Sequence, residues 1–152
     1  MKAISRPLLW AALSGLLIAG CRVETGPPSP TPADFPGIVR VMARQGIVVQ
    51  DIVSGDAGCP DPALTRLAIA FSASGLDQTG PVRIHAYLFR DRAAFDRLRP
   101  SIDLCARIFV TDPATFGSIE APPFVLAGQG PWAPGFAAAL RASVTAAAET
   151  GG

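Results

Sequence analysis

The side chains able to do chemistry are few, because 152 residues include one histidine, His85, and three cysteines. A Ser-His-Asp triad would have to use His85, but no G-x-S-x-G turn is present to expose a serine. A zinc site would combine one imidazole with carboxylates, which is an unusual ligand set. We therefore predict no catalytic, metal or other cofactor site. We interpret His85 as a histidine on the solvent-facing side of a strand, beside Arg83 and Tyr87.

Two pairs of carboxylates, Asp91 with Asp96 and Asp56 with Asp61, could in principle do acid–base work. Asp91 is better explained as a helix cap, and Asp96 as part of a solvated charge pattern with nearby arginines. The glycine-rich turn at residues 128–131 lacks the lysine and the glycine spacing of a phosphate-binding loop. The sequence therefore gives no positive sign of hydrolysis or phosphate binding.

The first 21 residues carry the clearest motif. Lys2 and Arg6 precede an uncharged apolar stretch, residues 7–19. This stretch is too short to cross a bilayer core of ~30 Å as a helix, which needs ~20 residues, but it has the length of a signal-peptide core. It runs into the sequence LIAGC, which ends at Cys21. This motif resembles the lipobox of bacterial lipoproteins, in which the cysteine thiol is lipidated and a peptidase cuts before it.

The resemblance implies that residues 1–20 are a lipoprotein signal peptide and that Cys21 carries the lipid, such as palmitate. Two alternatives stay open: a signal peptide cut elsewhere, with Cys21 an ordinary thiol, and an uncleaved anchor helix. Two or more acyl chains give stable anchoring, since each buried CH₂ contributes roughly 0.8 kcal/mol. We expect the cell membrane or the outer membrane as the location, with the domain facing the periplasm or the exterior.

Residues 21–33 are expected to form the lipidated cysteine and a proline-rich tether. Four prolines, at positions 27, 28, 30 and 32, lie within six residues. Proline fixes φ and lacks an N–H, so this segment suits neither a helix interior nor a sheet. An extended, semi-rigid spacer is the favoured interpretation, and a proline-rich ligand for another domain is the alternative.

Cys59 and Cys105 are left as an even pair in a protein expected to be exported. Oxidising compartments favour a disulfide between them. Closing a loop of about 46 residues would stabilise the fold by roughly 4 kcal/mol in the chain-entropy model. The alternatives are two free buried thiols and a redox couple, although redox pairs usually have a close spacing such as C-x-x-C.

Composition predicts one domain over residues 34–147, followed by a disordered tail at 148–152. Without Lys2 and Arg6, the 13 basic residues fall to 11, against 12 acidic residues. This near-neutral balance argues against nucleic acid as a partner and against a polybasic membrane-binding surface.

Hydrophobic periodicity predicts alternating helices and strands. Helices are expected over residues 35–45, capped by Asp34, over 91–100, and from 134 onward, and strands over 47–53, 64–74 and 82–89. The strand at 64–74 should bury one face. The strand at 82–89 alternates, with Val82, Ile84, Ala86 and Leu88 on one face and Arg83, His85, Tyr87 and Phe89 on the other. Residues 101–110 fit either a helix or a strand. The segment 117–126 contains Pro122-Pro123, which requires an edge, a bend or two short strands. This order predicts an α+β two-layer sandwich, with a mostly antiparallel sheet of about four or five strands and two to three helices on one face.

Two stretches together support this fold by resemblance: VRIHAYLFRDRAAFDRL at residues 82–98 and APPFVLAGQGPWAPGFAAAL at 121–140. They are similar to a group of uncharacterised bacterial lipoproteins that place one small α+β domain behind a lipobox. The resemblance implies the same fold and no particular activity.

Three functions stay open. A non-catalytic envelope domain that binds a protein or a cell-wall component is favoured, because catalytic groups are missing from the sequence. The alternatives are a carrier of a small molecule or lipid, and a hydrolase with a cryptic site. A flat, exposed apolar patch would favour the first function, a concave apolar pocket the second, and carboxylates gathered around His85 in a cleft the third.

Overall fold

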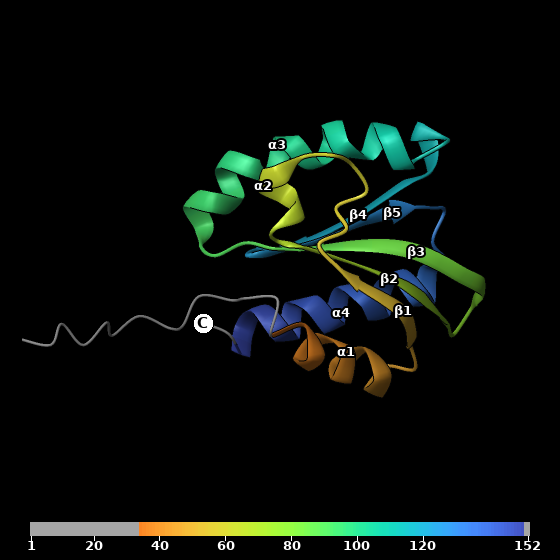
Figure 1. Ribbon diagram of the computed structural model, residues 1–152. Coiled ribbons are helices and arrows are strands. Elements are labelled where there is room, and N and C mark those ends of the chain that lie inside the picture. Colours follow the sequence, from red (N-terminus) through yellow and green to blue (C-terminus); the bar gives the residue numbers. More distant parts are fainter. Residues whose placement is uncertain (1–33, 151–152) are drawn as a thin grey trace, which may run out of the picture.

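The computed structural model describes residues 34–150, which form an α+β domain built on one antiparallel sheet (Figure 1). The five strands follow the order β1-β2-β3-β5-β4 across the sheet. They are β1 (Val48–Ser54), β2 (Ala68–Gly75), β3 (Gln78–Leu88), β4 (Phe116–Ala121) and β5 (Phe124–Gln129). The helices are α1 (Phe35–Arg44), α2 (Pro62–Thr65), α3 (Arg92–Phe109) and α4 (Pro134–Thr150), with a 3₁₀ turn at Pro113–Thr115. The predicted fold class is confirmed. Cys21, the signal peptide and the tether lie outside the described residues.

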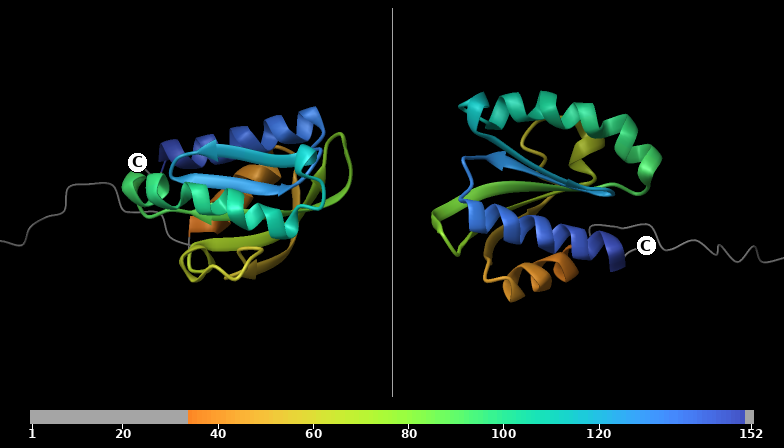
Figure 2. Two further views of the ribbon diagram at one scale, coloured as in Figure 1. Left: turned by 90° about the horizontal axis from the view of Figure 1, so that it is seen from above. Right: turned by 180° about the vertical axis from the view of Figure 1, so that it is seen from behind.

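Helices cover both faces of the sheet, so the domain has three layers where two were expected. Helices α1 and α4 lie on one face, and α2 and α3 lie on the other (Figure 2). Strand β2 shows the reason, since four consecutive residues from Ala68 to Phe71 are all buried. The prediction that this strand buries one face was wrong. Its alanines resemble solvent-facing residues in the sequence, but a small side chain also lets a second helical layer pack closely.

Two hydrophobic cores result, one on each side of the sheet. Ile84 and Leu88 of β3 point into the core beneath α1 and α4, where Phe136 of α4 is also buried. Tyr87 of β3 and Phe89, which directly follows the strand, belong to the core beneath α3. The predicted division of this strand into two faces is therefore confirmed.

Helix α3 differs most from the prediction, because it continues through Pro100 to Phe109. Proline in a helix interior removes one backbone hydrogen bond and crowds the carbonyl four residues earlier. Beyond Pro100 the helix buries Ile102, Cys105 and Ala106, and this packing outweighs the local preference. Asp91 caps the helix as predicted, accepting a hydrogen bond from the Ala94 N–H at 2.7 Å.

The structure also refines or corrects the predicted ends of several elements. Pro122-Pro123 separates β4 from β5, so the predicted alternative of two short strands is the observed one. Asp34 stands at the start of α1 but does not make the expected capping hydrogen bond. Helix α4 runs to Thr150, beyond residue 148 where the tail was expected to begin. Within residues 34–150, no helix combines the length and the apolar character needed to cross a bilayer.

Candidate functional site

A disulfide joins Cys59 to Cys105, as predicted from the even pair of cysteines. It connects the loop before α2 to the C-terminal part of α3, across 46 residues, with the two Cα atoms 5.3 Å apart. Cys105 is buried in the core beneath α3, whereas Cys59 is only partly buried. The bond therefore reaches from the core to the surface.

The loop that carries Cys59 is held by hydrogen bonds from two elements. The buried phenol of Tyr87 on β3 donates to the carbonyl oxygen of Ala57 at 2.8 Å. Burial, together with the nearby charge of Asp56, raises the pKa of Tyr87, so the phenol keeps its proton. At the far end of the loop, the Asp61 carboxylate accepts from the backbone N–H groups of Ala63 and Leu64 and caps α2.

His85 does not face solvent, so that prediction was wrong. Its exposed fraction is 4%, and its ring lies against the ring of Phe109 with centroids 4.5 Å apart. This cover was not predictable from the sequence, because Phe109 reaches His85 only when α3 continues past Pro100. Nδ1 lies 3.2 Å from the carbonyl oxygen of Asp56. A carbonyl can only accept a hydrogen bond, so Nδ1 is the protonated nitrogen of the neutral ring.

The surroundings of His85 give it a structural role in fixing the loop. Burial lowers the pKa of His85, although the hydrogen bond and the charge of Asp56 oppose this shift. Gly58 packs against the rings of His85 and Phe109 with φ +75°, and a Cβ there would lie 2.4 Å from Phe109 Cδ1. The imidazole therefore supports the turn that presents Cys59.

The carboxylates considered for acid–base work do not form a pair, because Asp56 and Asp96 each bind a different arginine. Asp56 pairs with Arg83 at 3.0 Å, and Asp96 pairs with Arg92 at 2.9 Å. Burial raises the pKa of Asp56, but hydrogen bonds from Gly58 and Arg83 and the neighbouring positive charges bring it below its usual value. Within residues 34–150, no three His, Cys, Asp or Glu side chains are placed to hold a metal ion.

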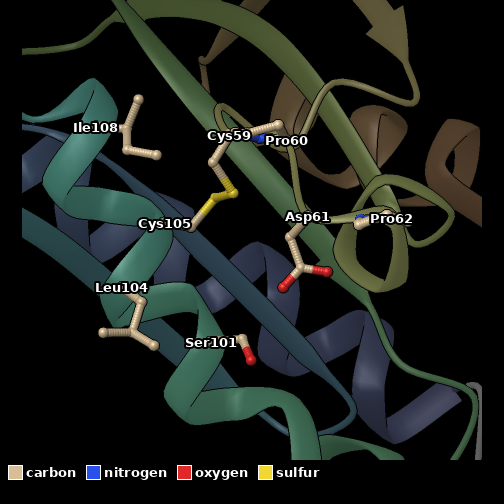
Figure 3. Close-up of a pocket in the computed structure, with 8 residues that line it drawn as sticks. All are labelled: Cys59, Pro60, Asp61, Pro62, Ser101, Leu104, Cys105 and Ile108. Atoms are coloured by element: carbon tan, nitrogen blue, oxygen red, sulfur yellow. A yellow bond between two sulfur atoms is a disulfide. The ribbon is translucent and has the colours of Figure 1, made fainter.

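An apolar groove of about 460 Å³ opens beside the disulfide (Figure 3). One wall is the loop from Cys59 to Pro62, and the other is one face of α3. The α3 residues are Ser101, Leu104, Cys105 and Ile108, at the spacing i, i+3, i+4 and i+7 that places side chains on one side of a helix. Leu104 and Ile108 are 60% and 63% exposed, which is unusual for aliphatic residues on a packed helix.

Sequence reasoning missed the groove. Its α3 wall lies in the segment that fitted either a helix or a strand, and its other wall is distant in the sequence. One signal was available: read as a helix, residues 101–108 place Leu104 and Ile108 on one side, away from Ile102 and Ala106.

A second exposed apolar surface lies on the edge strand β1, at Val48, Ile52 and Val53. The pairing of β1 with β2 is irregular between Gln50 and Val53, and Asp51 there has φ +51°. A bulge and a charge on an edge strand hinder the addition of a further strand. This edge is therefore a weaker candidate for a binding site than the groove.

The fold and the groove define an α+β domain with an apolar, disulfide-bonded surface cleft. Comparison of the chain with protein-family models, with curated proteins and with solved structures gives no match. The function of the domain is therefore inferred from its own residues and geometry.

Proposed function

We propose that the chain is a lipid-anchored protein of a bacterial envelope whose domain binds a partner, without catalysis, at the groove between the Cys59–Pro62 loop and α3. The exposure of Leu104 and Ile108 beside this groove is the observation that carries the proposal. Exposed aliphatic side chains next to a recess are typical of interaction sites, because burying them on association removes apolar surface from water.

Two observations support the envelope location. The sequence LIAGC follows a basic start and an apolar stretch and resembles a lipobox. The disulfide between Cys59 and Cys105 fits a protein that matures in an oxidising compartment, since such bonds are rare in the cytosol. The lipid on Cys21 would hold the domain at the membrane surface, and the tether would separate the two.

A carrier of a small apolar ligand is the second candidate. The groove volume of about 460 Å³ falls in the range of roughly 300–1,000 Å³ that ligand pockets occupy. Such pockets bury most of their ligand, however, whereas Leu104 and Ile108 leave one side of this groove open to water. A protein surface that covers both side chains therefore fits the geometry better.

The anchor is tested with Cys21→Ser and labelled palmitate. The natural chain should take up the label and sediment with membranes, and the variant should do neither. A Cys21→Ser chain that still incorporates palmitate and stays with membranes would refute the anchor.

The binding face is tested with Leu104→Arg and a matched change, Val53→Arg, at an aliphatic residue of β1 that is also exposed. We expect Leu104→Arg to abolish retention of the partner when the lipidated chain is isolated from native membranes, and Val53→Arg to preserve it. Equal retention by both variants would contradict the assignment of the groove.

A further inference from the structure

The charges around the groove carry an inference about its partner. Helix α3 has four arginines, and two of them are paired within the domain: Arg92 with Asp96, and Arg99 with Asp103 and Glu120. The other two, Arg97 and Arg107, form no ion pair with any residue of the described domain. Arg97 lies one turn before Ser101, on the same face of the helix as the groove residues, whereas Arg107 lies on another side of α3, beside Val110 and Phe116.

The opposite wall of the groove carries negative charge. Asp61 forms no ion pair within residues 34–150, and its carboxylate lies on the side of the loop that faces Ser101 (Figure 3). A purely basic partner would meet Arg97, and a purely acidic partner would meet Asp61. The groove therefore suits a surface that carries both signs around an apolar centre.

We infer that the partner is a second copy of this chain, docked through the same groove and the same face of α3. This inference rests on the proposed role of the groove as a binding site and names its occupant. A two-fold contact needs one surface that offers both a protrusion and a recess. Leu104 and Ile108 supply the protrusion, and the space beside the Cys59–Pro62 loop supplies the recess. Because the groove carries positive charge on α3 and negative charge at Asp61, two copies can pair opposite charges across the contact.

The size of the contact indicates a weak, reversible dimer. Stable complexes bury roughly 800 Å² on each partner, which is more than a groove lined by eight residues provides. Two copies tethered to one membrane meet at a much higher effective concentration than two copies in solution. The dimer should therefore be sought in the envelope and with the full chain.

Photo-crosslinking in living cells meets this requirement. Two versions of the full chain, with different C-terminal tags, are co-expressed, and one version carries benzoylphenylalanine in place of Leu104 or Ile108. Illumination should yield an adduct that contains both tags. The matched control carries the same photoreactive residue in place of Val53, which is 46% exposed on β1, and it should yield no such adduct.

The contribution of charge is measured with Asp61→Asn. Asparagine keeps a side-chain oxygen to cap α2 but removes the negative charge, so the adduct formed at Ile108 should fall about two- to fivefold, as expected for an exposed ion pair. Asp96→Asn is the control, because it removes a carboxylate of α3 that already has a partner within the domain, Arg92. Equal losses with Asp61→Asn and Asp96→Asn would overturn the charge argument.

The other outcomes are also decisive. An adduct at Leu104 and Ile108 with a different protein would overturn the second copy as the occupant while leaving the groove as a binding site. The absence of any adduct at either position would overturn the inference together with the proposed binding site.

Discussion

Opening the disulfide between Cys59 and Cys105 should cost much of the stability of the domain. The bond closes a loop across 46 residues, and in the chain-entropy model a cross-link of this span stabilises a fold by about 4 kcal/mol. For a domain of about 120 residues, a loss of about 4 kcal/mol corresponds to a decrease in melting temperature of roughly 16 °C. Urea denaturation of the oxidised and the reduced chain measures this difference without changing any side chain.

The local effect of reduction should be largest at α2. This helix has four residues, Pro62–Thr65, and an isolated helix of that length does not form in water. Backbone amides of α2 should therefore exchange with solvent sooner than those of α4 once the bond to α3 is lost. The double variant Cys59→Ala with Cys105→Ala should reproduce both effects. A reduced chain that loses less than about 1 kcal/mol would refute the reasoning, because the loop would then be held by its other contacts.

Three further predictions concern the support of the Cys59 loop. Tyr87→Phe leaves the Ala57 carbonyl without its 2.8 Å partner and should lower the free energy of unfolding by about 1–3 kcal/mol; an unchanged urea midpoint would contradict the role of this hydrogen bond. Because burial lowers the pKa of His85 in the folded state, the unfolded chain binds this proton first, so stability should decrease as the pH falls through roughly 6.5. His85→Phe should remove that step in a pH series of urea midpoints, and a persisting step would exclude His85 as its source. Gly58→Ala meets both a positive φ and a neighbouring ring and should cost at least about 1–3 kcal/mol, whereas Gly80→Ala, which meets nothing within 4 Å, should leave the melting temperature nearly unchanged; similar losses in both variants would contradict the packing argument.

Elements with a regular hydrophobic pattern were predicted correctly from the sequence. The prediction failed where a residue is buried by a segment that is distant in the sequence. The alternation in β3 assigned Ile84 and Tyr87 to opposite faces correctly. Alternation says which residues share a face, but it does not say whether that face is covered. For His85 the cover comes from Phe109, whose ring lies 4.5 Å away although the two residues are far apart in the sequence. The solvent-facing interpretation failed for this reason.

The disulfide was predictable because two cysteines in a protein expected to reach an oxidising compartment usually bond to each other. The groove beside it was not, since it requires both the bond and the course of α3. A local rule places a helix end at Pro100. Burial of Ile102 and Cys105 in the core beneath α3 overrides that rule, and only the whole fold reveals that such a core exists.

The same continuation of α3 accounts for the candidate site. If the helix ended at Pro100, Leu104 and Ile108 would not share a face, and Cys105 would not be positioned by a helix opposite Cys59. Ile102 and Ala106 are buried on the inner side of the helix, Leu104 and Ile108 project from its outer side, and Cys105 lies between the two sets. A helix that ended at Pro100 would not have displayed Leu104 and Ile108 side by side on its exposed face. Their presence on an element fixed by a core and by a disulfide argues that this surface is covered when the protein works, and the mixed charges around it argue for a partner with the same surface.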